Sequence, residues 1–285
     1  MSAPFQTLAD ETFVAGVGLH SGVHARVLLR PAKEVGIVFA RVDLDGAPKI
    51  SAAPSCIAQT THATTLQQNG ASLSTVEHLL AALYALGITH CRVEVDGPEI
   101  PILDGSAAPW CHAVREAGLS PTEQYSRRPI HALKETVRVG DEKSFVLGAP
   151  DPQFRLSVDV DFDLPYAGRQ TIDLVVAPES FETELAAART FTRFDWLEPL
   201  RAQGLIRGGS LDNAIVLEEA GPSSPFRMEN ELARHKALDV VGDLALLTAA
   251  DGGIIQAHIT AVKAGHLLHR QWMDECLRRG AFKVG

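Results

Sequence analysis

A short polar segment near the middle of the chain most constrains its fold. Residues 121–129 begin and end with proline and show no hydrophobic periodicity, which is typical of a linker. The segment divides the 285 residues into two nearly equal parts, each long enough to build a hydrophobic core of its own. The sequence therefore predicts two domains, residues 1–124 and residues 125–285.

The two halves show the same order of predicted elements. In each half several strands precede one amphipathic helix, and another strand follows that helix. The first helix is expected at residues 74–86, and aligning residues 76–80 with residues 233–237 places His78 and His235 at equivalent positions. An α/β (α+β) fold with an internal repeat would bring both histidines to the interface between the halves. The expected strands are residues 25–29, 36–42 and 91–95, then 136–139, 144–147, 156–160 and 254–259.

The helix of the second half carries a pattern typical of metal ligands. His235 and Asp239 are four residues apart and therefore lie on one helical face. The spacing mimics the H-E-x-x-H helix of zinc proteases, but Lys236 replaces the glutamate and Asp239 replaces the second histidine. The protease interpretation therefore fails. A third ligand and a catalytic carboxylate must come from elsewhere in the chain.

Glu77 and His78, near the start of the first helix, are the best candidates for these missing groups. A catalytic zinc ion usually has three protein ligands and an open fourth position for water. The other zinc pattern that includes this pair, H-x-x-E-H, needs a histidine at position 74, where the chain has Ser74. The pattern favours a metallohydrolase, and a non-catalytic metal-binding or RNA-binding protein is the alternative.

Charge, hydropathy and cysteine content exclude several classes of protein. The net charge of −9 argues against general binding of nucleic acid. No apolar run approaches the roughly 20 residues of a transmembrane helix, and the first residues lack the basic start and apolar core of a secretion signal. We therefore expect a cytoplasmic protein. The four cysteines form no C-x-x-C pair, which favours reduced thiols over disulfides or a thiolate zinc site.

Ordered blocks along nearly the whole chain resemble the UDP-3-O-acyl-N-acetylglucosamine deacetylases, which are zinc enzymes of lipid A biosynthesis. The resemblance implies two similar domains, each a β-sheet with paired helices, stacked as a β-α-α-β sandwich with pseudo-twofold symmetry. It also implies hydrolysis of the N-acetyl group of UDP-3-O-acyl-N-acetylglucosamine to acetate and a free amine. The matching blocks are residues 16–22, 73–83, 98–107, 188–191, 208–216, the segment around His235, and residues 263–266.

The resemblance also implies roles for individual residues. His78, His235 and Asp239 would bind Zn²⁺, with Fe²⁺ as the alternative metal in the cell. Glu77 would be the general base, and His266 would stabilise the oxyanion or protonate the departing amine. The supporting groups would be Asp243, which keeps His266 charged, and Thr190 and Lys236, which contact the oxyanion.

Recognition of the implied substrate requires contacts to an anion and an apolar channel. The resemblance places an acyl-chain-binding insert near residues 190–215, where Phe191 begins an apolar cluster; ordinary core is the alternative. Phe162 belongs to a block similar to a uridine contact, although Leu164 stands where histidine is expected. We expect a monomer that binds the nucleotide sugar, and a zinc amidase for another acyl amide is the enzymatic alternative. Further candidate contacts are His20, Thr61, His62 and Lys236.

Overall fold

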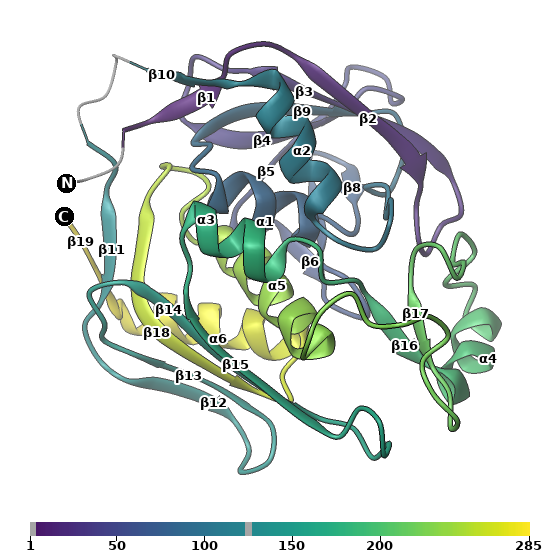
Figure 1. Ribbon diagram of the computed structural model, residues 1–285. Coiled ribbons are helices and arrows are strands. Elements are labelled where there is room, and N and C mark those ends of the chain that lie inside the picture. The colour runs from purple at the N-terminus through teal and green to yellow at the C-terminus, as the bar shows by residue number, and fades with distance from the viewer. Residues whose placement is uncertain (1–3, 123–126) are drawn as a thin grey trace.

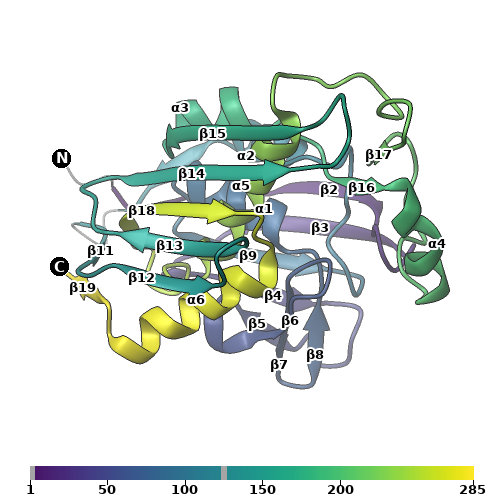
Figure 2. The same ribbon diagram turned by 90° about the horizontal axis from the view of Figure 1, so that it is seen from below.

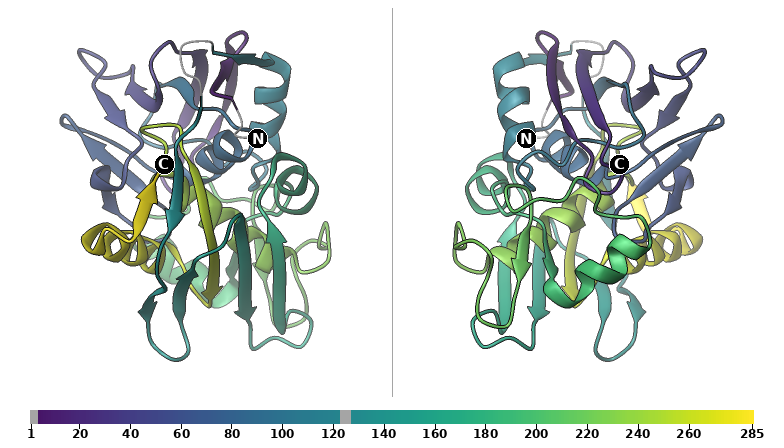
Figure 3. Two further views of the ribbon diagram at one scale, coloured as in Figure 1. Left: turned by 90° about the vertical axis from the view of Figure 1, so that its left-hand side faces the viewer. Right: turned by 90° about the vertical axis from the view of Figure 1, so that its right-hand side faces the viewer.

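The computed structural model describes residues 4–122 and 127–285, which form two seven-stranded sheets with helices between them (Figure 1). The first half of the chain builds one sheet and the second half builds the other. Figure 3 shows the two layers from both sides. This arrangement confirms the predicted sandwich. The helices between the sheets are α1 (Glu77–Ala85), α2 (Ala108–Ala117), α5 (Glu231–Ala245) and α6 (His266–Arg279).

The strands of the two sheets follow one another along the chain. Figure 2, seen from below, shows how the second sheet covers the helices. The first sheet contains β1 (Gln6–Leu8), β2 (Thr12–Val17), β3 (His24–Pro31), β4 (Gly36–Arg41), β5 (Lys49–Ser51), β9 (His90–Val95) and β10 (Leu119–Pro121). The second contains β11 (Ile130–Leu133), β12 (Val137–Gly140), β13 (Phe145–Ala149), β14 (Phe154–Asp161), β15 (Arg169–Val175), β18 (Ile254–Val262) and β19 (Phe282–Val284).

The strand pairings of the two sheets correspond one to one. The central strand, β9 or β18, is antiparallel to β3 or β13 and parallel to β4 or β14. It is also parallel to β1 or β11, and these pair with β10 or β19 in antiparallel fashion. A parallel neighbour requires a crossover, which α1 and α5 provide before the central strands. The predicted internal repeat is therefore confirmed.

The first helix starts later than the sequence predicts. Ser74 forms a β-bridge with Glu99, and Thr75 has a φ of 59°, which is incompatible with a right-handed helix. Helix α1 therefore begins at Glu77 rather than at Ser74. Gly87 follows the helix with a φ of 76°, as expected for a glycine that ends a helix. Glu77 and His78 thus occupy the first turn.

Helices α1 and α5 pack against each other in the centre of the molecule. A Cβ atom on Gly242 would lie 2.0 Å from the carbonyl oxygen of Glu77, so no larger residue fits without moving the backbone. Glycine in a helix costs about 1 kcal/mol relative to alanine, and the close approach of the two helices explains its presence here. The contact places the first turn of α1 directly against α5.

The apolar core is continuous across both halves, whereas the sequence predicts a separate core for each. Leu79 of α1 and Leu238 of α5 belong to one buried cluster. The reason is that the helices of both halves share one layer between the sheets. The predicted boundary between residues 124 and 125 falls within residues 123–126, outside the described part of the chain, and the linker's Pro121 belongs to β10.

Smaller elements extend each half. The first half adds η1 (Pro54–Cys56) and a three-stranded sheet of β6 (Ile57–Gln59), β7 (Thr65–Gln68) and β8 (Ala71–Leu73). The second half adds α3 (Pro178–Ser180), the π-helical turn η2 (Phe181–Leu185), β16 (Phe191–Arg193), α4 (Phe194–Ala202) and β17 (Ile215–Leu217). Strands β16 and β17 form a parallel pair, and with α4 they project from one end of the sandwich (Figure 1).

Among the described residues, no helix is long and apolar enough to cross a membrane. All four cysteines are buried and free, in agreement with the prediction of reduced thiols.

Candidate active site

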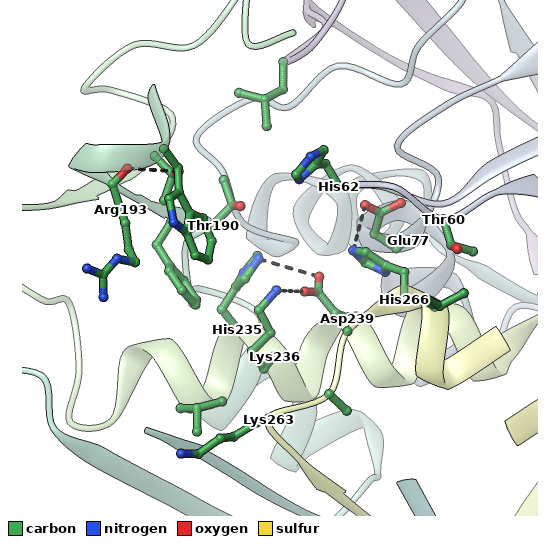
Figure 4. A pocket seen from close by; sticks show the side chains of 18 of the residues that line it. Thr60, His62, Glu77, Thr190, Arg193, His235, Lys236, Asp239, Lys263 and His266 are labelled. Atoms are coloured by element: carbon green, nitrogen blue, oxygen red, sulfur yellow. Dashed lines mark hydrogen bonds and ion pairs between the residues drawn. The ribbon is translucent and has the colours of Figure 1, made fainter. Parts of the chain in front are cut away.

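A cavity of about 770 Å³ lies where the first turns of α1 and α6 meet α5 and the β16–α4 extension. Figure 4 shows Glu77 and His266 on one side of it and His235 and Lys236 on the other. Asp243 does not line the cavity but is hydrogen-bonded to His266, which does. Thr61 does not line it either, whereas its neighbours Thr60 and His62 do. The lining includes the predicted site residues His20, Glu77, His78, Phe162, Thr190, Phe191, His235, Lys236, Asp239 and His266.

Three of these side chains converge on one point. The ligand atoms of His78, His235 and Asp239 all lie within 4.8 Å of one another, and all three residues are buried. The Nε2 atoms of both histidines are 3.6 Å from Oδ1 of Asp239. The rings are nearly perpendicular, with centroids 5.1 Å apart. The structure thus brings together one candidate ligand from α1 and two from α5.

The hydrogen bonding of His235 suits a metal cation. Its Nδ1 donates to the carbonyl oxygen of Ala188 at 3.1 Å, so in the neutral ring Nε2 carries a lone pair. Burial lowers the pKa of His235 to about 3, which keeps the ring neutral. That lone pair faces Oδ1 of Asp239 at 3.6 Å. Two electron-rich acceptors repel each other at this distance unless a cation lies between them. The donor set of two imidazoles and one carboxylate therefore fits a divalent metal ion.

Lys236 balances the charge of this cluster. Its Nζ donates to Oδ2 of Asp239 at 2.9 Å and leaves Oδ1 directed at the histidines. Burial opposes ionisation of Asp239, but the positive charge of Lys236 holds its pKa well below the usual value. Lys236, which replaces the glutamate of the H-E-x-x-H pattern, therefore keeps the carboxylate of Asp239 ionised. Its Nζ also lies 5.3 Å from the ring centre of Phe191.

Glu77 and His266 face each other beside the three candidate ligands. Oε1 of Glu77 is 3.8 Å from Nε2 of His266, and Oε2 accepts a hydrogen bond from the backbone N–H of Thr64 at 3.2 Å. Burial raises the pKa of Glu77, which brings this carboxyl closer to the range of a general base that works near neutral pH. The pair thus offers one proton acceptor and one cation at the same edge of the cavity.

Asp243 fixes the charge of His266. Its Oδ2 accepts the Nδ1–H of His266 at 2.7 Å. Burial and the position at the start of α6 would both lower the pKa of the imidazole, but the Asp243 carboxylate overcomes them and raises it to about 10. Burial would in turn raise the pKa of Asp243, and the two histidines at its carboxylate lower it. His266 is therefore an imidazolium at neutral pH.

The hydroxyl of Thr190 reaches the cavity because both halves hold its loop. The backbone N–H of Thr190 donates to the carbonyl oxygen of Gly105, and a Cβ on Gly105 would lie 2.2 Å from the carbonyl oxygen of Asn213. The preceding Arg189 forms a buried ion pair with Glu231 at 2.8 Å. These contacts position Thr190 and Phe191 opposite the candidate metal ligands.

Apolar side chains continue the cavity towards α4. The rings of Phe162 and Phe191 meet edge to face at 5.3 Å, and Trp196, Leu200 and Ile206 line the wall beyond them. Of the predicted apolar cluster, Phe194, Leu197 and Leu205 do not line the cavity, and Phe194 is 62% exposed. Phe191, Trp196, Leu200 and Ile206 thus give this end of the cavity an apolar wall.

Sequence reasoning did not assign a role to Glu99, which organises the loop that carries His20. The buried carboxylate accepts the backbone N–H groups of His20 at 2.9 Å and Ser21 at 2.7 Å. It also accepts the hydroxyl of Thr75 at 2.9 Å. The sequence signal was its place in the block of residues 98–107. Thr64 and His269, which contact Asp243, had no comparable signal.

Comparisons with known proteins give matches along nearly the whole chain. Residues 5–278 match the family model of UDP-3-O-acyl N-acetylglycosamine deacetylase. The chain is 44% identical over 268 residues to the UDP-3-O-acyl-N-acetylglucosamine deacetylase of Thermosynechococcus vestitus, covering 93% of this chain and 91% of that protein. It is 43% identical over 276 residues to the protein of the same name from Nostoc sp., covering 95% and 97%. The matched span contains every residue of the cluster described above.

Proposed function

The chain belongs to the UDP-3-O-acyl N-acetylglycosamine deacetylase family, and we propose that it is a zinc-dependent hydrolase of UDP-3-O-acyl-N-acetylglucosamine in lipid A biosynthesis. One observation carries the proposal. The lone pair of His235 and the ring of His78 converge on a buried, ionised carboxylate, with Glu77 and His266 beside them. The products would be acetate and the free amine of the sugar.

The proposed zinc ligands are His78, His235 and Asp239. Zinc in such a site supplies Lewis-acid chemistry, because it polarises a carbonyl oxygen and lowers the pKa of water. Two imidazoles and one carboxylate also accommodate Fe²⁺, which is the alternative metal. His235 would hold the ion as a neutral ring, in agreement with the low pKa of this histidine.

The protein's own groups would divide the remaining chemistry. Glu77 takes one proton from the attacking water, whose oxygen forms a bond to the acetyl carbonyl carbon. His266 carries the positive charge that stabilises the resulting oxyanion, or gives its proton to the nitrogen as the C–N bond breaks. The hydroxyl of Thr190 donates to the same oxyanion. Asp243 keeps His266 charged until such a proton transfer takes place.

Substrate binding would use the two ends of the cavity. The apolar wall near α4 takes the acyl chain, with Phe191 at its entrance. We assign Lys236 and Phe162 to the nucleotide, because an ammonium group and an aromatic face suit a diphosphate and a uracil ring. His20 and the loop around Thr61 are the proposed contacts from the first half.

Comparison of two substrates tests the proposal. We expect acetate release from UDP-3-O-acyl-N-acetylglucosamine and much slower release from UDP-N-acetylglucosamine. Burial of four methylene groups at about 0.8 kcal/mol each corresponds to roughly a hundredfold difference in kcat/KM. Phe194→Ala, outside the cavity, serves as a matched control that should keep the preference. Equal rates with both substrates would contradict the acyl-chain assignment. If neither substrate released acetate, the proposed function would be contradicted.

A further inference from the structure

The carboxylate of Asp243 accepts more hydrogen bonds than its pairing with His266 needs. Asp243 is buried, and its Oδ1 accepts the hydroxyl of Thr64 at 2.6 Å. Its Oδ2 accepts Nδ1 of His266 and also Nδ1 of His269, both at 2.7 Å. Three donors from two separate segments, the loop of Thr64 and helix α6, therefore hold one carboxylate, and rotation of that group would break at least one of the bonds.

His269 is placed for this contact by the helix that also carries His266. The two residues are three positions apart in α6 and therefore lie on neighbouring parts of one face. Their rings meet edge to face with centroids 5.9 Å apart. His269 is 1% exposed, and its buried Nε2 has no hydrogen-bond partner among the described residues. Within residues 4–122 and 127–285, the hydrogen bond of this ring is the one to Asp243.

This environment decides which of the two histidines is charged. A protonated His269 would bury a cation whose Nε2–H has no acceptor, whereas the neutral ring leaves only a lone pair unpaired, which costs less. Nε2 of His266, in contrast, faces Oε1 of Glu77 at 3.8 Å. Two adjacent imidazolium rings would also repel each other. The charge therefore lies on His266, and His269 is the neutral tautomer with its hydrogen on Nδ1.

We propose that His269 is a positioning residue that acts through Asp243. Its neutral ring donates to Oδ2 and, together with Thr64, fixes the orientation in which the carboxylate holds His266 against the cavity. The inference rests on the proposed function, because it assumes that His266 takes part in deacetylation. The other charged or titratable groups around His266 are Glu77 of α1, Asp239 of α5, and His20 and His62 of the first-half loops.

Two substitutions of His269 distinguish the effect of its hydrogen-bond donor from the effect of the volume of its ring. The amide nitrogen of asparagine can occupy the place of Nδ1, so His269→Asn keeps a donor to Asp243. Leucine fills a similar volume without one. With the acylated substrate, we expect His269→Leu to lower kcat about ten- to a hundredfold, the effect of one buried hydrogen bond to a charged group. We expect KM and zinc content to stay unchanged, and His269→Asn to keep kcat within about twofold of the wild type.

Equal kcat in wild type and His269→Leu would overturn the proposal, and so would equal impairment of both variants, since shape rather than the donor would then matter. Loss of thermal stability in His269→Leu with full kcat per folded molecule would show a purely structural role.

Nitrogen NMR of the histidine rings tests the tautomer of His269 without any substrate. At pH 7 we expect a neutral His269 protonated on Nδ1 and a charged His266; the reverse assignment would overturn the inference even in an inactive protein. An inactive wild type with the expected tautomers would count against the proposed function instead.

Discussion

Replacement of Glu77 by glutamine lowers kcat by about 10²- to 10⁴-fold, the usual contribution of a general base. Glutamine has the same shape and can still accept the N–H of Thr64, so KM, zinc content and the free energy of unfolding stay near the wild-type values. Initial rates of acetate release at saturating substrate give kcat. The matched control is Glu116→Gln, a glutamate whose side chain is 63% exposed on α2 and which should leave all of these values unchanged.

The same variant has a distinct pH profile. In the wild type, kcat/KM rises with pH as Glu77 loses its proton, at a pH above the usual range because burial raises its pKa. It falls again near pH 10, where His266 loses its charge. Glu77→Gln abolishes the acidic limb and keeps the basic one. A wild-type profile without an acidic limb, or full activity in Glu77→Gln, would exclude Glu77 as the base.

Replacement of His235 by alanine removes the metal and with it the activity. The free energy of zinc binding is roughly 10–16 kcal/mol for a site with four protein ligands. If each ligand contributes equally, loss of one weakens the zinc affinity by about a hundred- to a thousandfold. We therefore expect purified His235→Ala to contain little zinc and to release acetate at a rate near background. Metal content is measured by atomic emission, and circular dichroism checks the fold.

The control for this substitution is a histidine on the surface. The side chain of His112 on α2 is 73% exposed and forms an ion pair with Glu116, so His112→Ala should keep metal and activity. Full zinc content in folded His235→Ala would show that the metal lies elsewhere.

Local spacing explains why part of the site could be predicted from the sequence. His235 and Asp239 share a helical face whatever the rest of the fold does, and Glu77 and His78 follow a break that starts a helix. The interface between the halves follows from the repeated element order, because equivalent helices of a twofold arrangement meet at the axis. These predictions need only the spacing of residues along the chain and the order of its elements.

Contacts between distant segments account for what the sequence did not predict. Thr64 and Asp243 are 179 residues apart, and His20 and Glu99 are 79 residues apart. No periodicity links such pairs. The start of α1 was placed too early because the left-handed backbone of Thr75 depends on Glu99, which accepts its hydroxyl. The shared core likewise depends on Gly242, whose meaning appears only when α5 touches α1.

Titration of the metal-free protein with zinc tests the central claim most directly. The protein is stripped with a chelator, zinc or Fe²⁺ is added in known amounts, and acetate release from UDP-3-O-acyl-N-acetylglucosamine is measured at each step. We predict no activity without metal and a linear rise that ends at about one ion per chain, the capacity of the set formed by His78, His235 and Asp239. Full activity of the folded, metal-free protein would contradict the account.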